Sequence, residues 1–310
     1  LTDRETEKRL EIAFGDRDNP RFPNWHGEEC RPFPGDTVWP SPVLWENLNG
    51  TLGGVLIRPT PPAQVCYAPY YDVQKCAYVR QNFANTTFHT NDPGSVISQW
   101  EGGSSCLLPT NGTVGQNGDV IGIEGECRRG GMPEYVIRVG SVRDVQVGVN
   151  WARNMGVRLV VKNTGHDFLG KSQGAGSLSI WVHHLKSTEF LPSHTSGSYT
   201  GPAARIAAGI QTFELNRFAA SNRITILGPG GSTVGVAGGF LQGGGHSTLS
   251  SLYGLAADQV LEINIVTADG KFVTASEEEN QELFWAVRGG GGGPSSPFFF
   301  ITLQMFVFTN

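Results

Sequence analysis

The sequence is low in charge and has no long run of a single residue type. Charged side chains make up 16% of the 310 residues against 39% apolar ones, a balance typical of a folded chain. The net charge of −5, without a long basic run, excludes the usual nucleic-acid-binding composition, so we expect no nucleic-acid partner. The longest apolar run, residues 297–307, is shorter than the roughly 20 residues that span a bilayer, so we expect no membrane segment.

Cysteine is scarce and confined to one part of the chain. The spacings match neither a zinc ribbon nor CxxC chemistry, so we expect disulfides, a secreted protein and no metal site. Because the number is odd, one thiol is left over or pairs outside the chain. Sequons at positions 49, 85 and 111 are consistent with a secreted glycoprotein. The five cysteines are Cys30, Cys66, Cys76, Cys106 and Cys127.

Composition and hydrophobic periodicity divide the chain into three parts. Residues 1–130 are rich in Pro, Gly and Asn and predict an irregular, disulfide-tied N-terminal region. Residues 131–293 alternate between strand-like and helix-like patterns, and residues 294–310 form an atypical apolar tail. The interleaving predicts an α/β or α+β class with both element types packed in layers.

Within the middle part, the pattern predicts three units of strands and helices. Ser276 with Glu279 is expected to cap the last helix, which would run through Val287 and stop at Gly289. The other expected elements are strands at 135–139, 157–161, 205–208, 224–227, 260–267 and 271–274, a helix opened by a capping box at 141–144, a helix at 212–220 and a turn at 268–270.

One motif points toward a nucleotide hydrolase. GHDFLGKS at residues 165–172 fits the Walker A pattern GxxxxGK[ST] and follows an apolar strand. A phosphate-binding loop of that kind must lead directly into a helix, whereas the sequence after Ser172 has two glycines and then a β-rich alternation. We therefore interpret the match as a turn followed by a strand, and keep the P-loop hydrolase as a disfavoured alternative.

Glycine is the residue in excess, with 42 of 310 residues, about twice the usual 7%. NTGHD at residues 163–167 ends a strand in a tight turn that suits a diphosphate, with His166 at its tip. The tract 228–245 is half glycine with apolar residues spaced through it, which favours a backbone wrapped on a flat ligand. It contains no GxGxxG, so a nicotinamide Rossmann site is not supported. Taken singly, the tract could be a glycine-rich turn and His166 a hydrogen-bonded loop residue.

Four motifs in a fixed order carry a family resemblance. NTGHD, the tract 228–245, YGLAADQV at 253–260 and FWAVRGGGGG at 284–293 together resemble the vanillyl-alcohol oxidase superfamily. More narrowly, the chain is similar to secreted fungal FAD-linked oxidases of the berberine-bridge and isoamyl-alcohol-oxidase type. The resemblance implies an α+β FAD-binding domain of the PCMH type, built from two α/β subdomains.

The resemblance also implies how FAD is held. Residues 163–167 would bind its diphosphate, and His166 would be bonded to the flavin 8α carbon. Relatives with a second bond use a cysteine at the position of Gly231, so we expect one bond here. The implied cofactor-binding residues are Asn163, Thr164, Gly165, His166, Asp167, Ser172, Gly230, Gly231, Ser232, Val234, Gly235, Gly244, Gly245, Ser247, Asp258 and Val260.

The sequence departs from the family pattern in two places. A CxxFPGDxCWP-like element here has Val38 instead of its second cysteine, which leaves Cys30 as the expected odd thiol. The expected pairs are then Cys66 with Cys76 and Cys106 with Cys127. After Gly293 the family continues into a substrate domain, which this sequence does not show. We expect either a truncated or misread C-terminus, or a tail that takes the place of one sheet strand.

The expected function is that of an FAD-linked oxidase with a small-molecule substrate and oxygen as partners. It would transfer hydride from an alcohol-type or small organic substrate to flavin and then reduce oxygen to hydrogen peroxide. The resemblance names no catalytic base. The alternative is a secreted protein that keeps FAD without turnover, and bleaching of the flavin by substrate separates the two.

Overall fold

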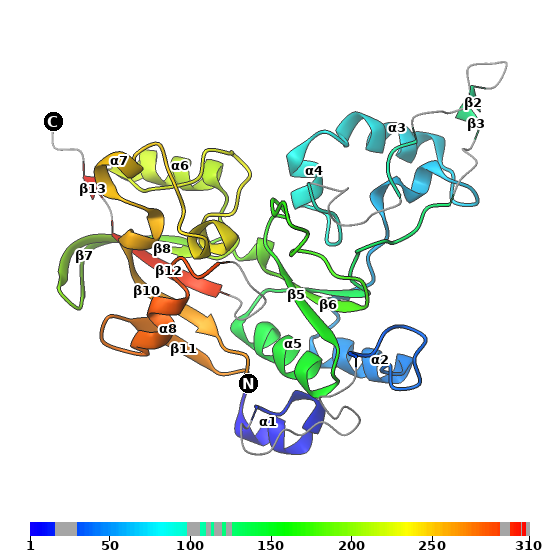
Figure 1. Cartoon of the computed structure of the whole chain (residues 1–310), viewed down its shortest axis with the longest axis horizontal. Coiled ribbons are helices and arrows are strands. Elements are labelled where there is room, and N and C mark those ends of the chain that lie inside the picture. Colours follow the sequence, from blue (N-terminus) through cyan, green and yellow to red (C-terminus); the bar gives the residue numbers. More distant parts are fainter. Residues whose placement is uncertain are drawn as a thin grey trace.

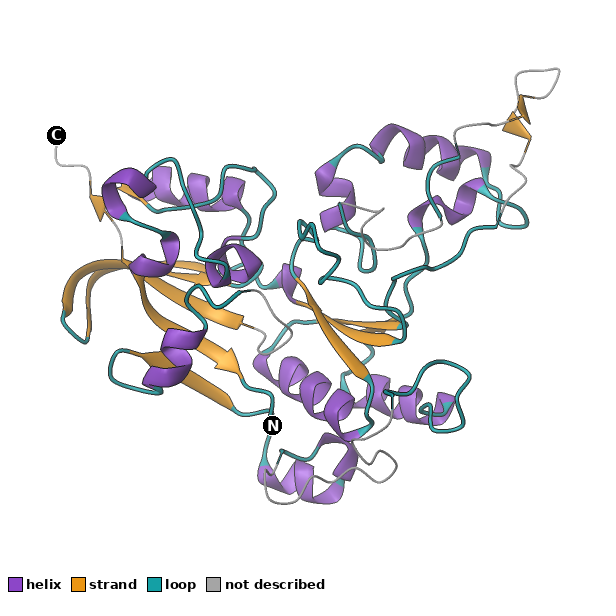
Figure 2. Cartoon of the chain, in the orientation of Figure 1, coloured by secondary structure: helices purple, strands orange, loops and turns teal. Residues whose placement is uncertain are grey.

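The computed structural model describes residues 1–15, 30–97, 106–109, 113–114, 120–121, 126–291, 298–304 and 306–307. Two sheets form the frame of the chain, with helices packed around them (Figures 1 and 2). The first sheet has the strand order β1-β4-β6-β5 and the second β11-β10-β12-β8-β7. The mixture of strands and helices in these two units confirms the α+β class. No helix in the described ranges is long and apolar enough to cross a membrane.

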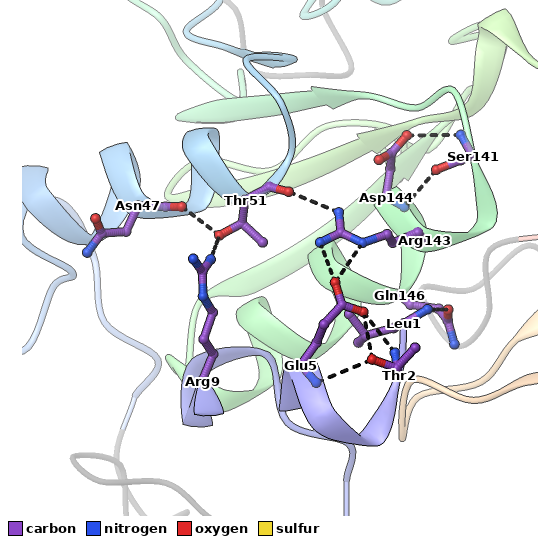
Figure 3. Close-up of polar contacts among 10 residues, drawn as sticks. All are labelled: Leu1, Thr2, Glu5, Arg9, Asn47, Thr51, Ser141, Arg143, Asp144 and Gln146. Carbon is purple, nitrogen blue, oxygen red and sulfur yellow. Dashed lines mark hydrogen bonds and ion pairs between the residues drawn. The ribbon is translucent and has the colours of Figure 1, made fainter. Parts of the chain in front are cut away.

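The first sheet is built on a parallel crossover. Strands β4 (Tyr135–Arg138) and β5 (Arg158–Lys162) both run parallel to β6 (Ser177–Trp181), and β1 (Leu56–Ile57) adds an antiparallel edge. Helix α5 (Val142–Asn154) connects β4 to β5 and packs on the sheet. As expected, its start is a capping box, which Figure 3 shows.

The capping box of α5 satisfies backbone groups that the helix itself cannot. Ser141 Oγ accepts a hydrogen bond from Asp144 N at 3.3 Å, and the Asp144 carboxylate accepts one from Ser141 N at 2.9 Å. The face of α5 that includes Val145 and Trp151 is completely buried in the core. Apolar burial therefore fixes the helix against the sheet, and the cap fixes where it begins.

The first residues of the chain pack against the first sheet and its helices, and we call this whole unit the first lobe. Helix α1 (Asp3–Lys8) lies beside α5, where Arg143 contacts Glu5 at 3.0 Å and also donates to the carbonyl of Thr51 at 2.9 Å (Figure 3). Thr51 ends α2 (Pro42–Thr51), so one guanidinium connects three helices. Hydrogen bonds from the Thr2 backbone and from Arg143 lower the pKa of Glu5 to about 2, so this contact persists in mild acid.

A disulfide-tied region forms a third unit. The bonds join Cys66 to Cys76 and Cys106 to Cys127, while Cys30 is free and exposed, as expected. Within this region the chain forms the helices α3 (Val73–Asn82) and α4 (Thr86–Thr90). Short strands β2 (Thr113–Val114) and β3 (Val120–Ile121) pair with each other. The sequon at 111 lies outside the described residues, and glycosylation stays a prediction.

The second sheet consists of two hairpins and one inserted strand. Strands β7 (Thr188–Ser196) and β8 (Tyr199–Ala207) form one hairpin, and β10 (Val260–Val266) and β11 (Phe272–Ser276) form the other. The second hairpin turns at Gly270, where φ is +86°, as the sequence indicates. Strand β12 (Phe298–Gln304) pairs with both β10 and β8. The apolar tail thus provides a sheet strand, which was one of the two expectations.

The second sheet and the helices α6, α7 and α8 together form the second lobe. Helix α6 (Thr212–Asn222) and the short strand β9 (Ile224–Thr225) fit the expected helix and strand, and β9 pairs with β13 (Phe306–Val307). Buried side chains of α6 and α8 share one apolar core with the sheet. The remaining helix is α7, Ser250–Tyr253.

The expected cap of the last helix is wrong. Helix α8 spans Gln281–Ala286 and begins after Asn280, not at Ser276. Ser276 instead ends β11, and its hydroxyl accepts hydrogen bonds from the backbone of Glu278 and Glu279, which closes the turn after the strand. A serine followed three residues later by glutamate suits such a turn as well as a helix start, because both expose unpaired N–H groups.

The loop that matches the Walker A pattern does not lead into a helix. Lys171 and Ser172 lie in a turn, and the next element is strand β6. A phosphate-binding loop needs the N-terminus of a helix at this point. The nucleotide-hydrolase alternative therefore loses its structural basis.

Candidate functional site

A cavity of about 670 Å³ lies between the loop after β5 and the glycine tract. One wall comes from the first lobe and the other from the second, so neither lobe forms the site alone. Gly230 and Gly239 have no heavy atom near the position that a Cβ would take, so the backbone there faces open space. The lining residues are Val161, Asn163, Thr164, Gly165, His166, Asp167, Phe168, Leu169, Lys171, Ser172, Val182, Pro229, Gly230, Gly231, Val234, Gly235, Ala237, Gly238, Gly239, Phe240, Gln242 and His246.

The loop after β5 is held in a specific conformation. Gly165 has φ +79°, a conformation that favours glycine, and a Cβ there would also crowd the Cα of Val96 at 3.2 Å. The Gly165 carbonyl accepts a hydrogen bond from Ile97 N at 3.0 Å. Farther along, the carboxylate of Asp167 accepts hydrogen bonds from Leu169 N and Ser172 N. The loop is thus closed internally and also fixed to the N-terminal region.

Asn163 connects the two walls of the cavity. Its Nδ2 donates to the carbonyl of Ala208 at 2.6 Å. A Cβ on Gly235 would lie 2.3 Å from the same nitrogen, so the glycine tract approaches Asn163 more closely than any other residue type would allow. The buried Oδ1 of Asn163 has no hydrogen-bond partner in the described part of the chain. A buried acceptor of this kind at a cavity wall is suited to accept a hydrogen bond from a ligand.

Below the loop, Lys162 is buried with 1% of its surface exposed. Its Nζ donates to the carbonyl of His89 at 3.1 Å and to that of Asp92, at the end of α4. Burial lowers the pKa of Lys162 to about 7, while the nearby Asp92 charge opposes the shift. The disulfide-tied region therefore supports the cavity loop from beneath. This contact joins residues about 70 positions apart, so no local sequence pattern predicts it.

His166 is the half-buried imidazole of the cavity wall. Its Nε2 lies 2.7 Å from Oγ1 of Thr233 in the glycine tract. Burial lowers the pKa of His166, so the ring is neutral at neutral pH. A neutral imidazole keeps a lone pair on one of its nitrogens, which is the electronic requirement for bonding to carbon.

Most of the expected site residues line this cavity, and some do not. Those that line it are Asn163, Thr164, Gly165, His166, Asp167, Ser172, Gly230, Gly231, Val234 and Gly235. Those outside the lining are Ser232, Gly244, Gly245, Ser247, Asp258 and Val260.

For the residues outside the lining, the structure shows packing or capping contacts. Asp258 accepts a hydrogen bond from Leu255 N at 2.7 Å, and Val260 is buried at the start of β10. The carbonyls of Gly244 and Gly245 accept from the 256–257 backbone. The cavity lining also includes residues that the motifs did not predict, although they are close neighbours of the motif residues in the chain. Among them are Phe168, Leu169, Gln242 and His246.

The chemistry of the lining fits a dinucleotide with a flat ring. Glycine backbone and the closed loop offer N–H groups for phosphates. Val161, Val182, Ala237 and Phe240 offer apolar surface for a ring. The unpaired Asn163 oxygen and the neutral His166 add polar groups at defined points. These properties define a class, a cofactor-binding α+β domain whose ligand lies between two lobes.

Comparison with known proteins agrees with this class. A family model described as an FAD binding domain matches residues 133–276. The VAO-type flavoprotein oxidase VAO615 of Thermothelomyces thermophilus is 44% identical over 268 residues, which are 85% of this chain and 45% of that protein. The FAD-linked oxidoreductase patO of Aspergillus clavatus is 40% identical over 277 residues, 89% of this chain and 46% of that protein.

Solved structures give the same result. The crystal structure of the VAO-type flavoprotein MtVAO615 from Myceliophthora thermophila superposes with a TM-score of 0.82 at 43% identity, covering 90% of this chain and 50% of that one. For MtVAO713 the TM-score is 0.78 at 34% identity, with 90% and 49% covered. Over most of its own length the chain is therefore similar to VAO-type FAD-linked oxidoreductases. It spans about half the length of the relatives it matches.

Proposed function

We propose that this chain is the flavin-binding part of a secreted oxidase that holds FAD through one covalent bond to His166. Bound FAD would supply the redox chemistry, taking hydride from an alcohol-type or other small organic substrate and reducing oxygen to hydrogen peroxide. The protein's part is to bind the cofactor, orient it and exclude water. Two disulfides support the secreted location, because such bonds persist in oxidising compartments.

The observation that carries the proposal is the position of His166. It lines the cavity, burial keeps it neutral, and one ring nitrogen is engaged by Thr233. His166 would lose its ring proton and gain a bond to the 8α carbon, which loses one hydrogen. The two protons and two electrons released would pass through the flavin to oxygen. Gly231 also lines the cavity and offers no side chain for a second bond.

The other lining residues would hold FAD without covalent bonds. The backbone of residues 163–167 and of the glycine tract would donate to the diphosphate, and Asn163 Oδ1 would accept from the cofactor. The apolar wall would cover the ring system.

The covalent bond is tested by acid denaturation. We expect the precipitated wild-type protein to keep its yellow colour and the precipitate of His166→Ala to lose it, because the variant has no nitrogen to hold the 8α carbon. His246→Ala is the matched control, since His246 is the other cavity-lining histidine in the described chain and should leave the colour unchanged. Absorbance of the washed pellet near the flavin maximum measures the result. Flavin that stays in the wild-type supernatant would refute the bond.

A second candidate is a protein that keeps FAD without turnover. The chain spans about half the length of its relatives, so turnover by this chain is itself a point to test. The two are separated by adding small alcohols without oxygen and recording the visible spectrum. Bleaching of the flavin, followed by peroxide formation on admitting oxygen, identifies the oxidase.

A further inference from the structure

The segment that carries Thr233 is fixed by the beginning of α6. The side chain of Gln211 donates through Nε2 to the Thr233 carbonyl at 3.0 Å, and Thr212 N donates to the Val234 carbonyl at 3.0 Å. Gln211 and Thr233 are both buried, with 4% and 5% of their surface exposed. The hydroxyl of Thr233 is therefore presented to His166 from a rigid backbone, and little entropy is lost in making the contact.

The hydroxyl contacts one ring nitrogen of His166 and leaves the other free. Nε2 lies 2.7 Å from Thr233 Oγ1, whereas Nδ1 has no hydrogen-bond partner among the residues that the structure describes. A neutral imidazole has one N–H and one lone pair, and the partner of one nitrogen determines which nitrogen has which. Within the described chain, Thr233 is the side chain whose hydrogen bond to His166 can favour one tautomer over the other.

We infer that Thr233 accepts a hydrogen bond from Nε2–H of His166 and thereby keeps the lone pair on Nδ1, the nitrogen that then bonds to the flavin. This assignment of Thr233 as a positioning residue rests on the proposed function. A hydroxyl can accept from Nε2–H or donate to a bare Nε2, so the tautomer of His166 is the quantity to measure. After attachment at Nδ1, the neutral ring carries a lone pair on Nε2, and the same hydroxyl can turn to donate to it without moving the backbone.

The tautomer can be observed without the cofactor. The chain is labelled with ¹⁵N-histidine and purified from cells limited for riboflavin, and each imidazole is then read by NMR as protonated at Nδ1 or at Nε2. The signals of His166 among the seven histidines are identified by their loss in His166→Ala. We expect His166 to be protonated at Nε2, with a bare Nδ1.

Three variants separate positioning from packing. Thr233→Val keeps the shape of the side chain but removes the hydroxyl, so we expect His166 to exchange between tautomers. Thr233→Ser restores a hydroxyl and should restore the single tautomer. Thr212→Val is the matched control, because Thr212 is also 5% exposed but its hydroxyl contacts the Val234 carbonyl, so His166 should stay as in wild type.

The rate of acid-stable flavin attachment gives a second measurement on the same variants. With FAD added to the flavin-free protein, we expect Thr233→Val to slow attachment about tenfold, the effect of one hydrogen bond, and Thr233→Ser to recover most of it. Protonation of wild-type His166 at Nδ1, or an unchanged tautomer and rate in Thr233→Val, would overturn the inference. If no variant attaches flavin while the tautomer depends on Thr233, the proposed function fails and the positioning role stands.

Discussion

Replacing Gly235 with alanine is expected to weaken FAD binding by one to two orders of magnitude. A Cβ at this position would lie 2.3 Å from Nδ2 of Asn163, so the Asn163 side chain or the wall that carries it must shift. Asn163 would then lose its hydrogen bond to the Ala208 carbonyl, which is 2.6 Å long. Overpacking and one lost hydrogen bond together cost about 2 to 3 kcal/mol, which is about a 30- to 150-fold change in Kd.

The measurement uses a His166→Ala background, in which the cofactor is exchangeable and Kd can be titrated by flavin fluorescence. A double-mutant cycle shows whether the effect passes through Asn163. Because Asn163→Ala removes the side chain that the new methyl group meets, we expect Gly235→Ala to add little to it. Additive effects of the two substitutions would show that Gly235 acts on the cofactor by another route.

The second large effect concerns Lys162 and pH. The folded chain lowers the pKa of this buried amine to about 7, from 10.5 for an exposed lysine, because burial disfavours the charged form. Between these two values the unfolded chain binds more protons than the folded chain, so the free energy of unfolding rises with pH. Well below pH 7, both states are protonated and the cost of burying the charge is largest.

We expect this one group to add up to about 4 kcal/mol between pH 7 and 10.5. Lys162→Met should remove that part of the pH dependence, since methionine fills a similar volume without titrating. Lys171→Met is the matched control, because Lys171 is exposed nine residues farther along the chain and should leave the slope as in wild type. Urea unfolding followed across this pH window gives the three slopes. Equal slopes in wild type and Lys162→Met would contradict the prediction.

Lys162 also links stability to the site. Its contacts with the carbonyls of His89 and Asp92 hold the disulfide-tied region against the loop that carries His166. The region matched by the family model, residues 133–276, does not include this support. A fragment limited to those residues would therefore lack a contact that fixes the cavity loop.

The sequence by itself determined the features that depend on residues close together in the chain. The capping box at Ser141, the turn at Gly270 and the absence of a helix after Ser172 each depend on residues a few positions apart, and the structure confirms all three. The glycine tract is also recognisable locally, because flexible linkers lack its regularly spaced apolar residues. The role of Ser276 was ambiguous for the same reason. A serine hydroxyl accepts hydrogen bonds from unpaired backbone N–H groups both in a turn that ends a strand and at the start of a helix.

Only the tertiary structure decided which groups meet in the cavity. His166 and Thr233 are 67 positions apart, and Lys162 and His89 are 73 apart, so no periodicity or short motif could pair them. Asp258 and Val260 belong to a family motif, and the fold places them in a turn and at the start of β10, outside the lining of this cavity. The reason is that spacing along a chain fixes backbone shape over a few residues, whereas the neighbours of a buried side chain depend on how the sheets and helices pack together.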